Sequence, residues 1–452
     1  MTSPLALASY LTLGTALLFG GAARRDVPSD YVPEFIALPL LALALPGAFE
    51  RLRREPLTLA ILAGLLALLL LHLVPLPAFV WSALPGREIA TASYDAAVVG
   101  RPVLPLSMQP QEALKGGLAL IPAFALFLAA VNLGARARRA LVIIALAIGV
   151  VSLPLGILQI LGGVNNSLYF FAITNNNRAV GFFANANHYA AFFYVLIPLG
   201  AAVFAERRRI QGVPCWTLMV ALTIICILGL AVSGSRSALA LGALSLGLSG
   251  WFLMRRPLQE VINSHSWWLI AAPMALGVLM LASAMGLSLI IGRFDGAGSV
   301  DDARMGLFAA TWDLIWRYSP TGSGLGTFEK LYEVYAPGSP GGGQVANHAH
   351  NDYAEIAMEA GLPGIALIGA FFVWFARRAR AAFVVEPDFE GRLGMASVIA
   401  VALLCIHSAW DYPLRTIALS SLFGLCAAFL FVAPADPAAS AVRHRKVRRD
   451  DG

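Results

Sequence analysis

Long apolar stretches recur along almost the whole chain, and they constrain its fold more than any other feature of the sequence. About twelve of them are long enough to cross a membrane as a helix, because a hydrocarbon core of about 30 Å requires roughly 20 apolar residues. They lie near residues 4–22, 33–49, 57–80, 113–133, 139–161, 187–205, 214–232, 237–254, 267–291, 352–376, 394–413 and 415–433. Only 13% of the residues are charged, against roughly 25% in an average soluble domain. The sequence therefore predicts an all-α polytopic membrane protein with about 12 transmembrane helices.

Clusters of basic residues indicate how the predicted spans are oriented. Tight basic runs lie beside span ends at alternate connections, namely 51–54, 136–139, 207–209, 255–256, 377–380 and 443–449. Because cytoplasmic loops are enriched in Lys and Arg, both termini are expected to be cytoplasmic, with Arg24 and Arg25 as the exception. The excess of 32 Lys and Arg over 26 Asp and Glu is then an orientation signal, and no nucleic-acid partner is expected. The first stretch lacks a preceding basic region and is expected to be retained as a span.

Three connections on the predicted outer side are long, at about 81–112, 162–186 and 292–351. The last contains aromatic residues at spacings that a packed helix could use, so a partly helical periplasmic cap between spans nine and ten is expected. The predicted organisation has four parts: spans one to nine in 1–291, the long periplasmic loop or cap in 292–351, spans ten to twelve in 352–433, and a disordered basic cytoplasmic tail in 434–452.

Two polar clusters precede or separate predicted spans. In residues 175–188, Arg178 could contact an anion and asparagines such as Asn187 could donate to sugar hydroxyls, whereas helix capping is the simpler interpretation. The turn 233–237 carries Arg236 at the start of a predicted helix. Free backbone N–H groups, hydroxyls and a guanidinium together suit a phosphate, and contact with lipid headgroups is the alternative.

The long connection contains a third cation and a glycine-rich stretch. Arg304 follows Asp301 and Asp302, so it could pair with them on the surface or face the membrane domain as a further cation. The glycines of 319–328 resemble a phosphate-binding loop, but no Lys-Ser/Thr follows them. That stretch is therefore expected to be a tight turn.

Two histidines lie where the long connection re-enters the membrane. A pair such as His348 and His350 suggests zinc, but a catalytic zinc generally needs three protein ligands, and the third would have to be Asp352 or His188. A histidine near the lipid interface and close to arginines suits a general base better. The four cysteines lie within apolar stretches and have no metal or disulfide spacing. No metal and no other cofactor is expected.

Together these segments resemble the O-antigen ligase and O-antigen polymerase superfamily of bacterial inner-membrane glycan-assembly proteins. The resemblance covers about 180–375 and rests on residues 181–188, 233–237, 302–304, 318–328, 350–355 and 359–364. It implies a metal-independent, inverting glycosyltransferase that takes a glycan from an undecaprenyl-diphosphate-linked donor and joins it to an acceptor hydroxyl. The protein would lie among the lipids of the bacterial inner membrane, with its active site facing the periplasm.

The resemblance also implies roles for individual residues. The reactive histidine of the family lies at the end of the long periplasmic loop and matches His350, and the two arginines that hold the donor diphosphate look like Arg236 and Arg304. His348 is an alternative to His350, although the following Asn-Asp favours His350. Arg178 is a further candidate for diphosphate binding, and the candidate supporting residues are His348, Asn351, Asp352 and Asn187.

The acceptor and a competing class stay open at this stage. A ligase would use lipid A-core oligosaccharide, a polymerase would extend a growing lipid-linked glycan, and a protein O-oligosaccharyltransferase would modify a hydroxyl amino acid. We expect a ligase, with the other two as alternatives. A lipid-linked oligosaccharide flippase or transporter is the competing class, and Asp411 with His407 is its best charged pair. That pair could equally mark an interfacial helix end within an aromatic belt.

Overall fold

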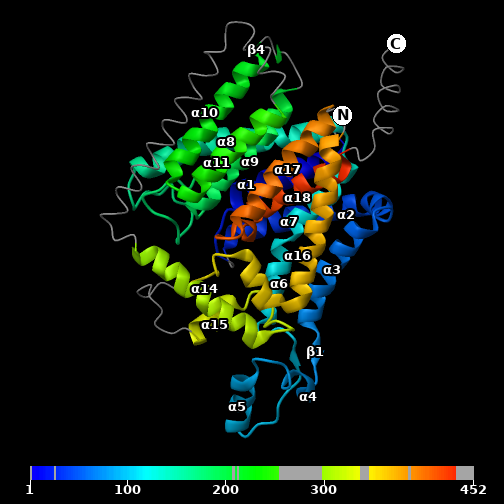
Figure 1. The fold of residues 1–452 in the computed structure, drawn as a ribbon, viewed down its shortest axis with the longest axis vertical. Helices are drawn as coiled ribbons and strands as arrows, with labels where there is room; N and C mark the ends of the chain where they lie inside the picture. The colour runs from blue at the N-terminus through cyan, green and yellow to red at the C-terminus, as the bar shows by residue number, and fades with distance from the viewer. Residues whose placement is uncertain are drawn as a thin grey trace.

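The computed structural model describes residues 3–24, 27–205, 209–210, 213–253, 298–335, 346–384 and 388–433. Within these residues the chain is almost entirely helical (Figure 1). The predicted ninth span near 267–291, the basic pair Arg255 and Arg256, and the predicted tail 434–452 lie outside the described residues.

The elements follow one another along the chain as helices with two short strand pairs. The helices are α1 (Pro4–Phe19), η1 (Pro28–Asp30), α2 (Tyr31–Leu52), α3 (Pro56–Leu73), α4 (Ala78–Trp81), α5 (Glu88–Ala96), α6 (Pro110–Ala119), α7 (Ile121–Asn132), α8 (Ala135–Leu161), α9 (Ala186–Phe204), α10 (Cys215–Ser233), α11 (Arg236–Phe252), α14 (Gly298–Tyr318), α15 (Phe328–Tyr335), α16 (Asp352–Val384), α17 (Phe389–His407), η2 (Pro413–Arg415) and α18 (Ile417–Val432). Strand β1 (Pro75–Leu76) pairs antiparallel with β2 (Leu104–Pro105), and β3 (Arg209–Ile210) pairs antiparallel with β4 (Val213–Pro214).

Eight helical segments of the described chain are long and apolar enough to cross a membrane. They are Pro28–Leu52, Pro56–Leu73, Pro110–Asn132, Ala135–Leu161, Ala186–Phe204, Cys215–Ser233, Asp352–Phe383 and Phe389–His407. The helices α1 and α18 are apolar but have only 16 residues each, and α11 follows the predicted span 237–254 with 17 residues. The prediction of an all-α polytopic membrane protein is confirmed. The total number of spans stays a prediction.

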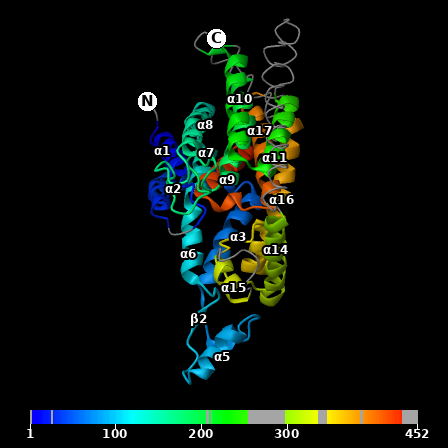
Figure 2. The ribbon, with the colours of Figure 1, turned by 90° about the vertical axis from the view of Figure 1, so that its left-hand side faces the viewer.

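The apolar run at 57–80 ends as a helix earlier than the sequence analysis expected. Helix α3 stops at Leu73, and β1 starts at Pro75. The prolines at positions 75 and 77 explain the difference, because proline has no N–H to donate and its ring clashes within a helix. The chain then leaves the bundle to form α4 and α5, and both views place α5 at the opposite end of the molecule from α10 (Figures 1 and 2).

Helix α9 is the centre of the helical bundle. Its side chains Phe192, Phe193 and Tyr194 are fully buried, and the helix packs against α8, α10, α11 and α17. Small residues on the neighbouring helices permit this approach, since a Cβ on Gly229 of α10 would lie 2.5 Å from the Phe193 ring. Close van der Waals packing of this kind holds membrane helices together, because lipid is as apolar as the side chains. This packing fixes the position of α9, including its first turn, which carries polar residues.

Helices α14 and α15 make up much of the described part of 292–351, which agrees with the expected partly helical segment. They share a small apolar cluster with the start of α16, formed by Leu307, Leu314, Tyr318, Phe328, Leu331, Ala349 and Met358. Figures 1 and 2 show both helices on the side of the bundle away from α10. This packing fixes the short segment before α16, which carries both predicted site histidines.

Helix α16 bends at Gly361, where φ is 58° and ψ is −150°. The glycine-rich turn 319–327 docks onto the bend, and the N–H of Gly324 donates to the Glu359 carbonyl at 2.8 Å. A Cβ on Gly361 would lie 2.1 Å from the carbonyl oxygen of Pro320. The stretch is thus a tight turn that contacts α16 through its backbone, and the left-handed φ at Gly361 favours glycine.

We predict that Gly361→Ala destabilises the protein by about 2 kcal/mol or more, because the new Cβ meets backbone and the residue keeps a strained conformation. Gly369→Ala in the same helix is the control, since a Cβ there has no neighbour within 4 Å. Apparent melting temperatures in detergent compare the two. Equal melting temperatures for the two variants would show that the bend does not depend on glycine.

Candidate active site

Three elements that are far apart in the sequence meet at one polar site. The segment 346–352 before α16 contacts the turn 408–416 between α17 and α18. The Asp352 N–H donates to the Ser408 carbonyl at 2.9 Å, and the Ser408 hydroxyl donates to the Asp352 carboxylate at 2.8 Å. The start of α9 reaches the same place through Asn187. Polar side chains from all three elements therefore gather beside the core of the bundle.

Asp411 is the carboxylate at the centre of this site. Its side chain is only 1% exposed, and it accepts hydrogen bonds from the Asn187 amide at 2.7 Å and the Tyr412 N–H at 3.0 Å. His350 Nδ1 lies 3.2 Å from Oδ1 of Asp411, and His407 Nε2 lies 3.7 Å from its Oδ2. Burial alone raises the pKa of Asp411, but the His350 hydrogen bond and the nearby imidazoles hold this pKa well below its usual range. The hydrogen bonds that Asp411 accepts from Asn187 and the Tyr412 N–H also favour its ionised form.

His350 is oriented by this carboxylate. Because an ionised carboxylate can only accept hydrogen bonds, Nδ1 of His350 carries a hydrogen, and in the neutral ring the lone pair is then on Nε2. The His350 side chain is 30% exposed. Its φ is 51°, a left-handed conformation that a non-glycine residue keeps only where its surroundings enforce it. The predicted base thus combines a fixed orientation with access from outside the buried cluster.

His348 forms a second histidine–carboxylate pair. Its Nδ1 lies 2.8 Å from Oε1 of Glu355, and the other oxygen of Glu355 accepts the Ala349 N–H at 2.8 Å. The His348 side chain is 7% exposed. Both histidine rings pack against the Tyr412 ring, with centroids at 4.4 Å for His348 and 4.9 Å for His350. The two candidate bases therefore have separate carboxylate partners and share one aromatic neighbour.

Arg415 ties the turn 408–416 to the first segment of α16. Its guanidinium lies 3.2 Å from Asp352, 3.3 Å from Glu355 and 3.3 Å from Glu359. These carboxylates share one face of the helix, since residues three and four positions apart are neighbours on a helix surface. Burial lowers the pKa of Arg415, but the three carboxylates raise it above its ordinary value. The fixed positive charge therefore holds the carboxylates, and the segment carrying both histidines, against the turn.

Arg178, Arg236 and Arg304 are the arginines predicted to bind a diphosphate, and the structure describes the side chains of the first two. Arg178 and Arg236 are exposed, and neither side chain forms a hydrogen bond or ion pair with a described residue. Arg236 is the first residue of α11, which Ser235 caps by accepting the Ala238 N–H at 3.3 Å. Arg304 falls within α14, but its side chain lies outside the described residues. Diphosphate binding by these arginines stays a prediction.

The structure brings together several other predicted site residues. Asn187, His348, His350 and Asp352 all belong to the cluster. Asn351 acts locally, because its side chain accepts the Ala354 N–H at 3.0 Å at the start of α16. Asn187 has a partner that the sequence analysis did not anticipate, since its side-chain amide donates to Asp411 at 2.7 Å.

Sequence reasoning missed the importance of Asp411, Glu355 and Arg415. It weighed Asp411 with His407 only as a transporter pair or a helix end, whereas the structure places both beside His350, with the Tyr194 hydroxyl 3.0 Å from His407 Nδ1. The spacing of the α16 carboxylates could have indicated a shared cation. No pattern in the sequence identifies that cation as Arg415.

The sequence left a zinc site at His348 and His350 as an alternative. In the parts of the chain that the structure describes, no group of three or more His, Cys, Asp and Glu side chains is arranged to hold a metal ion. Of the suggested third ligands, Asp352 is engaged by other groups, whereas neither ring nitrogen of His188 has a hydrogen-bond partner among the described residues. Asp352 is bonded to Ser408 and Arg415, and the His188 ring packs edge-on against Tyr412 at 4.9 Å.

The fold and site define an α-helical polytopic membrane protein with a histidine–carboxylate cluster beside its core. Residues 221–369 match the family model described as O-antigen ligase, which confirms the resemblance to the O-antigen ligase superfamily. The matched segment runs from within α10 to within α16 and includes Arg236, Arg304, His348 and His350. A comparison with curated proteins found no match. The family match supports a glycosyltransferase-type activity of the ligase or polymerase kind, with lipid-linked glycans as substrates.

We predict that Arg415→Met destabilises the protein by about 3–5 kcal/mol, because it leaves three buried carboxylates without their cation. Adding Glu359→Gln should recover part of the loss by removing one of those charges. Arg53→Met is the control, since Arg53 pairs with Glu50 at 2.7 Å where both side chains are more than half exposed, and it should cost less than about 1 kcal/mol. Thermal unfolding measures all three. Equal losses for Arg53 and Arg415 would contradict the structural role of Arg415.

Proposed function

We propose that this protein transfers a glycan from an undecaprenyl-diphosphate-linked donor to an acceptor hydroxyl at the periplasmic face of the bacterial inner membrane, as an O-antigen ligase acting on lipid A-core. The family match over 221–369 supports the donor class and the type of reaction. The observation that carries the proposal is the partly exposed His350 ring held through Nδ1 by buried Asp411. A general base needs this combination of orientation and access.

His350 acts as the base in this proposal. Asp411 accepts the Nδ1 hydrogen, so Nε2 takes the proton of the acceptor hydroxyl as its oxygen attacks the anomeric carbon of the donor sugar. The bond from that carbon to the diphosphate oxygen breaks, and the diphosphate leaves with the bonding electrons. One displacement of this kind inverts the anomeric centre and needs no metal. Asp411 stabilises the imidazolium that forms, as a carboxylate does in other histidine-dependent enzymes.

The leaving diphosphate requires positive charge, which we assign to Arg236 and Arg304 with Arg178 as a further contributor. Guanidinium groups suit this role because they donate two hydrogen bonds to phosphate and stay charged when partly desolvated. Arg236 is at the N-terminus of the 17-residue helix α11, where free N–H groups and the helix dipole also favour an anion. Its lack of a partner among the described residues leaves its guanidinium available to a ligand.

The acceptor distinguishes three related activities that share this donor chemistry. A ligase transfers to lipid A-core oligosaccharide, a polymerase to a growing lipid-linked glycan, and a protein O-oligosaccharyltransferase to a hydroxyl amino acid. The family match supports an activity of the ligase or polymerase kind. We place the ligase first, and membrane lipids around the helices would hold the polyprenyl chain of the donor.

We predict that His350→Ala and Asp411→Asn each lower transfer by about 100-fold or more, because the first removes the base and the second removes the charge that orients it. The assay uses nanodisc-reconstituted protein, an undecaprenyl-diphosphate-linked glycan and lipid A-core, with chelator present. His348→Gln is compared in the same assay. A loss confined to the His348 variant would transfer the role of base to His348, and elongated lipid-linked glycan as the product would identify a polymerase.

We predict that Arg236→Ala and Arg304→Ala lower transfer by about 100-fold, with a smaller loss for Arg178→Ala, because charge-assisted bonds to the leaving group are lost. Arg236→Lys should retain part of the activity, since lysine keeps the charge without the planar fork. Arg53→Ala is the matched control for an exposed arginine outside the site. Unchanged transfer in the first two variants would exclude them from diphosphate binding.

A further inference from the structure

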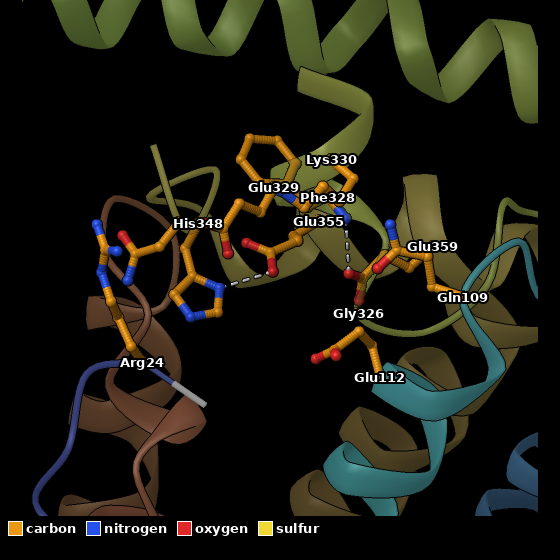
Figure 3. A pocket seen from close by; sticks show the side chains of 11 residues that line it. Arg24, Gln109, Glu112, Gly326, Phe328, Glu329, Lys330, His348, Glu355 and Glu359 are labelled. Carbon is orange, nitrogen blue, oxygen red and sulfur yellow. Dashed lines mark hydrogen bonds and ion pairs between the residues drawn. The ribbon is translucent and has the colours of Figure 1, made fainter. Parts of the chain in front are cut away.

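A cavity of about 260 Å³ lies beside the active-site cluster, on the side of His348. The start of α6, the turn around Gly326, the start of α15 and the segment before α16 surround it (Figure 3). Arg24, from the connection between α1 and η1, also lines it. His350 is not among its lining residues. The cavity is therefore a space distinct from the surface that His350 reaches, although it borders the same segment of chain.

His348 is the buried histidine that lines this cavity, together with the buried carboxylates of Glu355 and Glu359. His348 is 6% exposed, and its Nδ1 is taken by Glu355 at 2.8 Å, as the dashed line in Figure 3 marks. Its Nε2 has no hydrogen-bond partner in the part of the chain that the structure describes. Because Glu355 is held by Arg415 and accepts the Nδ1 hydrogen, the neutral ring presents Nε2 to the cavity as an acceptor.

The charges around the cavity select against a phosphate. Four carboxylates line it, from Glu112, Glu329, Glu355 and Glu359, and only Arg24 and Lys330 among its lining residues are cationic. Like charges close to one another cost free energy in a partly buried site. Glu355 and Glu359 are paired with Arg415, and Glu112 is paired with Lys115. The carboxylate oxygens of the lining can only accept hydrogen bonds, so they disfavour the donor diphosphate, which also lacks donor groups.

The same lining suits a ligand with several hydroxyl groups. A hydroxyl both donates and accepts hydrogen bonds, so it can donate to Glu329 or to His348 Nε2 and accept from Arg24 or Gln109. Within the described residues, the side chains of Arg24 and Glu329 form no hydrogen bond or ion pair of their own. The volume of 260 Å³ is just below the range of about 300–1,000 Å³ of drug-sized ligand pockets, which fits one monosaccharide unit.

We propose that this cavity binds one neutral sugar unit of the acceptor saccharide, and that His348 positions it by accepting a hydrogen bond from a sugar hydroxyl. The inference rests on the glycan transfer proposed above. His348 and His350 are two residues apart and pack against the same Tyr412 ring. A sugar bound at His348 therefore lies beside the base, which remains His350. Because a protein substrate carries no sugar at this position, the cavity favours a saccharide acceptor.

The test compares Glu329→Ala with Glu333→Ala. Glu329 lines the cavity, whereas Glu333 is four residues further along α15, pairs with Lys330 at 3.0 Å and does not line it. At saturating donor, Glu329→Ala and His348→Gln should raise the KM for lipid A-core about 5–10-fold, as expected for one lost hydrogen bond. Their kcat should change less than about two-fold, and Glu333→Ala should match the wild type. Binding of undecaprenyl diphosphate, measured directly, should be the same in all variants.

Two results would overturn the inference. Weaker binding of undecaprenyl diphosphate in Glu329→Ala would make the cavity part of the donor site, and an unchanged KM in both cavity variants would remove the acceptor from it. In either case, glycan transfer by the wild-type protein would still support the proposed function.

A second measurement separates this inference from the proposed function if the wild type makes no glycosidic product. Saturation-transfer NMR would then follow methyl glucoside, methyl galactoside and methyl N-acetylglucosaminide with wild-type protein and with Glu329→Ala. Binding of any of them that the variant loses would support the sugar site even though the transferase assignment had failed. No binding to the wild type would overturn the sugar site as well.

Discussion

The ion cluster around Arg415 is the interaction on which the rest of the site depends. A single guanidinium lies within 3.3 Å of the carboxylates of Asp352, Glu355 and Glu359. Those three residues form one face of the short helical segment before the bend at Gly361. A buried ionic group contributes little to stability when compared with apolar packing, but removing one partner is costly. Its effect here is positional, because it fixes the start of α16 against the turn that carries Asp411.

Two histidine–carboxylate pairs follow from this arrangement, and they differ in what they can reach. His350 is bonded to Asp411 and is partly exposed, whereas His348 is buried, is bonded to Glu355 and lines the cavity beside α6 and α15. The Tyr412 ring lies between them in contact with both. In the proposed reaction the first pair moves a proton and the second orients a sugar. Each carboxylate decides which nitrogen of its histidine is free.

The general features of the fold could be predicted from the sequence because they depend on local patterns. Apolar length identified the membrane helices, and the prolines at 75 and 77 account for the early end of α3. The bend at Gly361 was not predictable, because it depends on backbone contact with the distant turn 319–327. Tertiary packing thus decides what the local pattern leaves open.

The site was predictable only in part, for a similar reason. His350 and Asn187 were found through motifs in single segments of chain. The partner of both, Asp411, lies in a third segment, and Arg415 follows it in the same turn. A polar residue at the end of an apolar helix has several ordinary explanations, so only the folded chain shows that Asp411 is buried and shared. Among the described residues, no hydrogen bond or ion pair joins the side chain of Arg178 or Arg236 to His350.

In the proposed reaction, Asp411 fixes His350 with a hydrogen on Nδ1 and a free Nε2. Nitrogen-15 NMR of protein labelled at histidine reports the tautomer directly when recorded near pH 8.5, where unperturbed imidazoles are neutral. His350→Gln assigns the signal, and Asp411→Asn tests its cause. We expect a hydrogen on Nδ1 of His350 in the wild type and a loss of that preference in Asp411→Asn. A hydrogen on Nε2 of His350 in the wild type would contradict this expectation.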